Sequence, residues 1–199
     1  MQRRTLLAAP LAFAIAGRAA AAQSLKGKRI LIVYYSRAGE NWGGGGPLVN
    51  LKVGNTKRFA QKIHAITDGD MFEIETVKAY PAGYRATTEV AAQELREEAR
   101  PAMKRPVPDM SGYDVIFLGH PIWWGKMPRV VMNFVEQAKF AGKIVIPFCT
   151  HGGSGLGSSP ADIRRVHPDA DVRAGIGIPG VEIEQADGEI RSWLASLGF

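Results

Sequence analysis

Short runs rich in β-branched and aromatic residues recur along the chain, and each is followed by a segment whose apolar residues recur at helical spacing. The runs lie at 29–35, 70–77, 113–119, 142–150 and 172–180. Helical spacing begins near 56 and recurs within 84–100, at 129–138, from about 160 and at 183–198. Runs this apolar are typical of strands buried on both faces. The alternation therefore predicts an α/β fold, a parallel sheet with helices on both faces.

The first 22 residues have the features of an export signal. Arg3 and Arg4 precede an apolar stretch at 6–15, and small residues lead up to Gln23. The stretch is too short to span a bilayer, which disfavours an uncleaved membrane helix. The paired arginines resemble the twin-arginine signal of bacteria, with a plain secretory signal as the alternative. We expect a cleaved leader at 1–22 and a periplasmic protein.

The remaining residues, 23–199, are enough for one domain. Without the three arginines of the leader, the 25 basic residues fall to 22, against 19 acidic ones, so the domain has a net charge of +3. No basic stripe with interleaved aromatics is present, which argues against a nucleic-acid partner. The single cysteine, Cys149, excludes an intramolecular disulfide and is expected to be buried and inert. The histidines show no spacing typical of a metal site.

In an open parallel sheet, a ligand binds beyond the carboxyl ends of the strands. The first loop opens there with the sequence "SRAG" at 36–39, whose hydroxyl and glycine residues suit an anion at a helix N-terminus. No helix can follow Asn41, because Trp42, four glycines and a proline come next. Asn55 and Thr56 are good N-cap residues, and the helical pattern starts at about residue 56. The two pieces form one anion site only if residues 40–54 loop out and return.

The excursion at 40–54 has two interpretations. Val49, Leu51 and Val53 alternate with polar residues like a short strand, which favours a small hairpin or flap. The alternative is a surface insertion with no role. The cost of closing a loop grows only with the logarithm of its length, so the fold tolerates either.

Two further loops end at the same sheet edge. The second, "GHPIWWG" at 119–125, contains Trp123 and Trp124, of which one is expected to face a flat ligand ring while the other packs. The alternative is that both belong to the core or an interface. The third, "CTHGGSGLG" at 149–157, offers glycines and backbone donors. His151 within it is either a ligand partner or proton donor, or a structural residue.

The motifs "YDVIFLGHPIWWGKMP" and "GKIVIPFCTHGGSGLG" resemble the flavodoxin-like family of FMN proteins, in particular a bacterial, exported branch. The resemblance covers essentially the whole domain, 23–199, and implies a flavodoxin-like α/β fold, a doubly wound five-stranded parallel sheet with helices on both faces, with non-covalently bound FMN. It implies a phosphate site at Ser36, Ala38, Asn55 and Thr56. It implies isoalloxazine contacts from Pro121, Ile122, Trp123, Trp124 and Gly125, and from Thr150, His151, Gly152, Gly153 and Gly155 at the far edge of the ring. The family's compact Ser-x-Thr-Gly-Asn-Thr run is split here, and Ala38 replaces a threonine.

Three functions follow from this resemblance. The first is electron transfer through FMN to a redox partner protein, although the domain lacks the acidic character of long-chain carriers. The second is an FMN-dependent NAD(P)H:quinone-type oxidoreductase, in which a small quinone-like acceptor meets the flavin under the glycine-rich flap. The third is a binding module that keeps the fold without a flavin. The sequence names no catalytic residue and no metal ligand.

Overall fold

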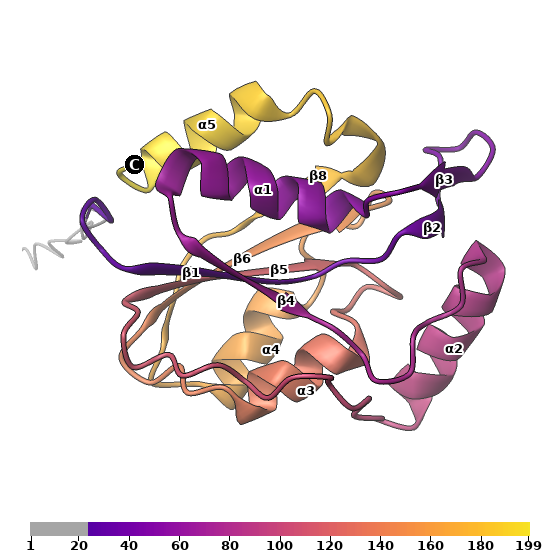
Figure 1. Cartoon of the computed structure of the whole chain (residues 1–199), viewed down its shortest axis with the longest axis horizontal. Coiled ribbons are helices and arrows are strands. Elements are labelled where there is room, and N and C mark those ends of the chain that lie inside the picture. The colour runs from indigo at the N-terminus through magenta and orange to yellow at the C-terminus, as the bar shows by residue number, and fades with distance from the viewer. Residues whose placement is uncertain (1–23) are drawn as a thin grey trace, which may run out of the picture.

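The computed structural model describes residues 24–199, so the expected leader at 1–22 lies outside the described residues. A parallel sheet runs through the centre of the molecule in the order β4-β1-β5-β6, with β7 and β8 both paired to the outer edge of β6 (Figure 1). The bounds of these strands are β1 Ile30–Tyr35, β4 Asp70–Ile74, β5 Val115–Pro121, β6 Ile144–His151, β7 Asp171–Val172 and β8 Ile176–Pro179.

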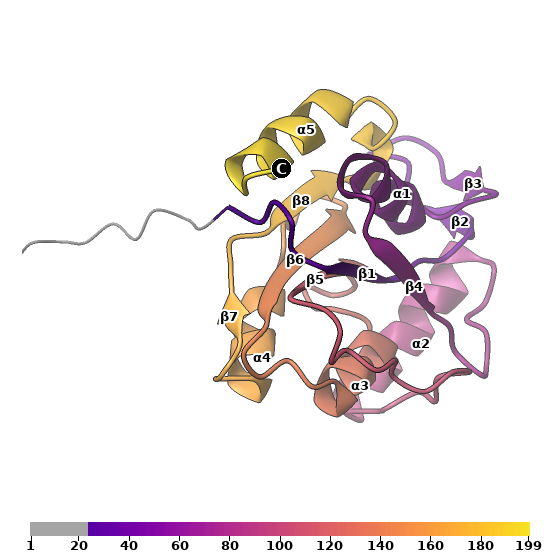
Figure 2. The ribbon, with the colours of Figure 1, turned by 60° about the vertical axis from the view of Figure 1, so that its left-hand side comes forward.

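Helices cover both faces of the sheet, as the sequence predicts. Figures 1 and 2 show α1 (Asn55–Thr67) and α5 (Asp187–Ser196) on one face, and α3 (Arg129–Gln137) and α4 (Ser159–Val166) on the other. The remaining helix, α2 (Tyr84–Arg96), lies beyond the carboxyl ends of the strands, next to a hairpin formed by β2 (Gly39–Asn41) and β3 (Val49–Leu51). None of the helices within 24–199 has the length and apolar character needed to cross a membrane.

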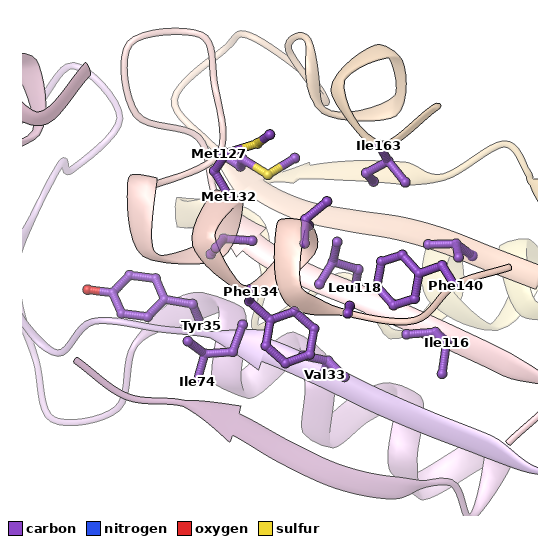
Figure 3. Packing of buried hydrophobic residues seen from close by; sticks show 14 of the residues in the cluster. Val33, Tyr35, Ile74, Ile116, Leu118, Met127, Met132, Phe134, Phe140 and Ile163 are labelled. Carbon is purple, nitrogen blue, oxygen red and sulfur yellow. The ribbon is translucent and has the colours of Figure 1, made fainter. Parts of the chain in front are cut away.

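The apolar runs of β1, β5 and β6 supply side chains to two cores, one on each face of the sheet. Val33 and Leu118 pack with Phe134 of α3 in the first core (Figure 3). In the second core, the rings of Phe59 on α1 and Phe148 on β6 meet edge to face, with centroids 4.8 Å apart. Burial on both faces explains why these strands read as continuous apolar runs.

The fifth strand of the predicted sheet is divided into β7 and β8. The N–H of Arg173 donates to the Val145 carbonyl. The odd-numbered residues in this part of β6 therefore direct their backbone N–H and C=O groups toward the edge that pairs with β7 and β8. Pro147 therefore faces the same edge, where it has no N–H to donate. Its carbonyl closely approaches Gly175, where a Cβ would lie 1.9 Å from the oxygen. The missing donor and this close approach interrupt the ladder.

We predict that Gly119→Ala lowers the free energy of unfolding by about 1–3 kcal/mol, because a Cβ on this β5 residue would lie 2.1 Å from Cζ of the buried Phe148 ring. Gly188→Ala in α5 is the matched control. Nothing lies within 4 Å of its added Cβ, and alanine is the better helix former by about 0.5–1 kcal/mol. Urea unfolding of both variants measures the difference, and equal midpoints would contradict the packing argument.

Candidate functional site

The end of β1 and the start of α1 meet directly, although the hairpin separates them in the sequence. The backbone of Gly54 approaches so closely that a Cβ there would lie 2.3 Å from Ser36 Oγ. Ser36 Oγ in turn accepts a hydrogen bond from the N–H of Lys57 at 3.0 Å, in the first turn of α1. The N-cap is Gly54, so the expectation that Asn55 or Thr56 caps the helix is wrong. Ser36, from across the loop, supplies the capping oxygen that glycine lacks.

This junction leaves hydrogen-bond donors free at the N-terminus of a 13-residue helix. Within 24–199, the backbone N–H groups of Asn55 and Thr56 have no intramolecular acceptor, whereas that of Arg58 bonds to the Gly54 carbonyl. The Ser36 hydroxyl accepts one bond and keeps its proton for a second. Two free amides, a hydroxyl and the positive end of the helix dipole together form a site for an anion.

Contacts from two other segments fix the same helix end. The Thr56 hydroxyl lies 2.8 Å from that of Thr150 at the end of β6, and both residues are buried. The amide of Asn55 lies against Gly180, where a Cβ would be 2.8 Å from Nδ2. The anion site is therefore bonded to the third loop and not only to the first.

Twelve of the fourteen residues assigned by resemblance line one cavity of about 820 Å³ at the carboxyl edge of the sheet. They are Ser36, Asn55, Thr56, Pro121, Ile122, Trp123, Trp124, Gly125, Thr150, His151, Gly152 and Gly153. The other two do not line it. Ala38 is exposed, and the Gly155 carbonyl accepts a bond from the Cys149 thiol at 3.2 Å. The cavity brings the anion site and the second and third loops together.

The second loop is a tight turn that directs its two tryptophans differently. Trp123 and Lys126 exchange backbone hydrogen bonds, and Trp124 and Gly125 between them have φ of 53° and 74°. Positive φ at both central residues is the pattern of a type I′ turn. The Trp124 side chain stays 61% exposed, and its Nε1 donates to the Thr88 carbonyl of α2 at 3.0 Å.

Trp123 packs into a cluster of aromatic rings. Its ring meets those of Tyr35 and Tyr80 edge to face, with centroids 5.7 and 4.9 Å away. One tryptophan is thus held by aromatic neighbours while the other keeps a free surface. That one of the two tryptophans faces a flat ligand ring stays a prediction, since both line the cavity.

The third loop owes its shape to His151. Its Nδ1 accepts a hydrogen bond from the N–H of Gly153 at 2.9 Å. Gly153 has a φ of 125°, a backbone conformation that only glycine adopts easily. This contact gives His151 a structural role within the cavity wall. Nearby Cys149 is fully buried, and burial raises the pKa of its thiol to about 12, so the thiol stays protonated. No cluster of His, Cys, Asp or Glu that could hold a metal occurs in the described part of the chain.

The structure adds cavity residues that the sequence did not predict. Some lie on α2, which no motif connects to the site. Others lie in or beside the hairpin, where the sequence predicted only that a glycine-rich flap covers a small acceptor. The additional lining residues are Arg37, Asn41, Trp42, Tyr84, Thr87, Thr88, Ala91, Ser154 and Gly180.

These features define a doubly wound α/β protein whose cavity suits a ligand with an anionic end and a flat ring. The family model described as Flavodoxin matches residues 50–197. The chain belongs to the flavodoxin family, as the two sequence motifs predict. No curated protein matches it.

Solved structures agree with this assignment. A candidate flavoprotein from Bacteroides eggerthii DSM 20697 is 29% identical, with a TM-score of 0.66 over 86% of this chain and 99% of that one. A second, from Bacteroides uniformis ATCC 8492, is 28% identical, with a TM-score of 0.64 over 83% and 99% of the two chains. A flavoprotein from Lactobacillus acidophilus NCFM in complex with FMN shares the fold at 21% identity, with a TM-score of 0.58 over 79% and 97%.

We predict that Ser36→Ala lowers the free energy of unfolding of the ligand-free protein by about 1 kcal/mol, because the Lys57 amide loses its capping oxygen. Ser192→Ala is the control. Its hydroxyl only bonds back to the Gly188 carbonyl within α5, so its loss should change stability little. Urea unfolding measures both, and a Ser36→Ala protein as stable as the control would show that the cap is energetically unimportant.

Proposed function

We propose that this chain binds FMN non-covalently and transfers electrons through it. The observation that carries the proposal is the single cavity in which an anion site at the α1 N-terminus meets two loops rich in tryptophan and glycine. A phosphate needs the first feature, and a flat conjugated ring needs the second.

The residues present fit FMN at both ends. Ser36 and the free amides of Asn55 and Thr56 would hold the phosphate, the donor set expected for a charged ligand at a helix N-terminus. The second and third loops would hold the ring and exclude water from it. Bound FMN supplies one- and two-electron redox chemistry, and the protein tunes it through these contacts. Flavodoxin-family membership and the FMN complex of the Lactobacillus acidophilus protein support this proposal.

We further propose that the protein works in the periplasm with a redox partner protein. The proposal rests on the leader-like sequence at 1–22, whose arginine pair resembles a signal for export of folded proteins. Such export would allow the cofactor to be loaded before the chain leaves the cytoplasm. With a net charge of +3, the domain does not have the acidic surface of long-chain carriers, so its partner must be recognised differently.

The function is tested by anaerobic reductive titration of the FMN-loaded protein. A carrier should take up electrons in two resolved one-electron steps and should show negligible NAD(P)H turnover. Steady NAD(P)H-to-quinone turnover would instead establish a reductase. A purified, folded protein that takes up no added FMN would overturn both and leave a flavin-free binding module.

We predict that Asn55→Ala weakens FMN binding about tenfold, the loss typical of one charge-assisted hydrogen bond, because the side-chain amide lines the cavity at the helix end and would add a donor to the backbone amides, which alanine keeps. Thr56→Ala removes a hydroxyl at the same helix end and should weaken FMN binding as well. Riboflavin lacks the phosphate, so its affinity should not change. Asn50→Ala, on the exposed surface of β3, is the control. Fluorescence titration with both flavins measures the effect, and unchanged FMN affinity in both variants would show that neither side chain contacts the phosphate.

A further inference from the structure

The hairpin at 39–51 is bonded to the start of α2. Arg37, just before it, donates from Nη1 to the carbonyls of Pro81 and Ala82 at 2.9 and 3.0 Å, and from Nη2 to the Glu40 carbonyl. The N–H of Glu40 donates back to Ala82 at 2.9 Å. The Glu40 carboxylate accepts the first N–H of α2, from Tyr84, at 3.1 Å. These bonds fix the base of the hairpin against the helix.

The rest of the hairpin reaches across to the third loop. A Cβ at Gly152 would lie 3.1 Å from Cε3 of Trp42, so the indole ring is in contact with the Gly152 backbone. A Cβ at Gly44 would lie 3.2 Å from both methyl groups of Val181, in the turn after β8. The hairpin therefore extends from α2 to the segments that follow β6 and β8. It is an integral part of the site and not a free surface insertion.

Trp42 lines the cavity, and its side chain is still 39% exposed. Trp124, the other exposed tryptophan, lines the same cavity from the second loop. Removing the surface of a large apolar ring from water is favourable, so a flat ligand that packs against such a ring gains binding free energy. Among the exposed apolar side chains, these two are therefore placed to gain from a ring bound in the cavity.

We propose that Trp42 is a contact residue for the flat ring of the cofactor, and that the hairpin holds it there to slow the release of that cofactor. The inference rests on the proposed FMN function and adds a ring contact that comes from the insertion. Arg37 is a positioning residue in this arrangement, because its bonds to three carbonyls hold the hairpin base from which Trp42 extends.

The test is the rate of flavin release after dilution of the FMN-loaded protein, followed by flavin fluorescence. Trp42→Ala should release FMN about tenfold faster, and riboflavin faster by the same factor, because the contact is with the ring and not the phosphate. Trp42→Phe should fall between wild type and alanine. Leu48→Ala is the control, because this residue is 47% exposed on the same hairpin and does not line the cavity. Release at the wild-type rate from Trp42→Ala would overturn the inference.

Arg37 gives a second, independent readout. Arg37→Lys keeps the charge but replaces the planar guanidinium, whose two terminal nitrogens bond to different carbonyls, with a single nitrogen, so it should also speed release. If Arg37 acts through Trp42, the double variant should be no faster than Trp42→Ala alone, whereas fully additive effects would overturn the positioning role. Failure of the wild-type protein to bind flavin would overturn the proposed function itself. Binding with a Trp42-independent release rate would overturn only the role of the hairpin.

Discussion

The hydrogen bond from the Lys57 amide to the Ser36 hydroxyl is the contact on which the site depends. It closes the gap between the end of β1 and the start of α1 after an excursion of more than a dozen residues. Gly54 makes this possible, because any side chain there would collide with Ser36 Oγ. Loop closure over this distance costs little more than over a short loop. A chain that preserves this one junction can therefore carry an inserted hairpin without losing the anion site.

The hairpin and α2 depend on each other. Within α2, only Thr87 and Ala91 are buried, so the helix has little apolar contact to hold it in place. Its N-cap is Gly83, which offers no side-chain bond, and the Glu40 carboxylate of the hairpin supplies the missing acceptor. A negative charge at that position also suits the helix dipole. The insertion thus stabilises the helix that forms the facing wall of the cavity.

The sequence predicts the parts of this molecule that follow from local pattern. The strands are legible because both of their faces are buried, and the start of α1 is legible because glycines and Pro47 exclude a helix before it. Pro147 carried a signal for the divided fifth strand, but its effect depends on which edge it faces. No signal in the sequence indicated that α2 lies beside the cavity, since Tyr84 and Thr88 reach the site only through tertiary contacts. Long-range hydrogen bonds such as those of Arg37 produce no periodic pattern in the sequence, so they cannot be predicted from it.

The walls of the cavity are joined through α2 and not only through the sheet. Trp124 adopts a positive φ that costs a bulky residue about 1–3 kcal/mol, and its indole bond to the Thr88 carbonyl helps to offset that strain. Glu40 joins the hairpin to the first residue of the same helix. A shift of α2 would therefore move the hairpin that bears Trp42 and the loop that bears Trp124 together. The same helix thus holds both exposed tryptophans at the cavity, Trp42 through the hairpin and Trp124 through its own indole bond.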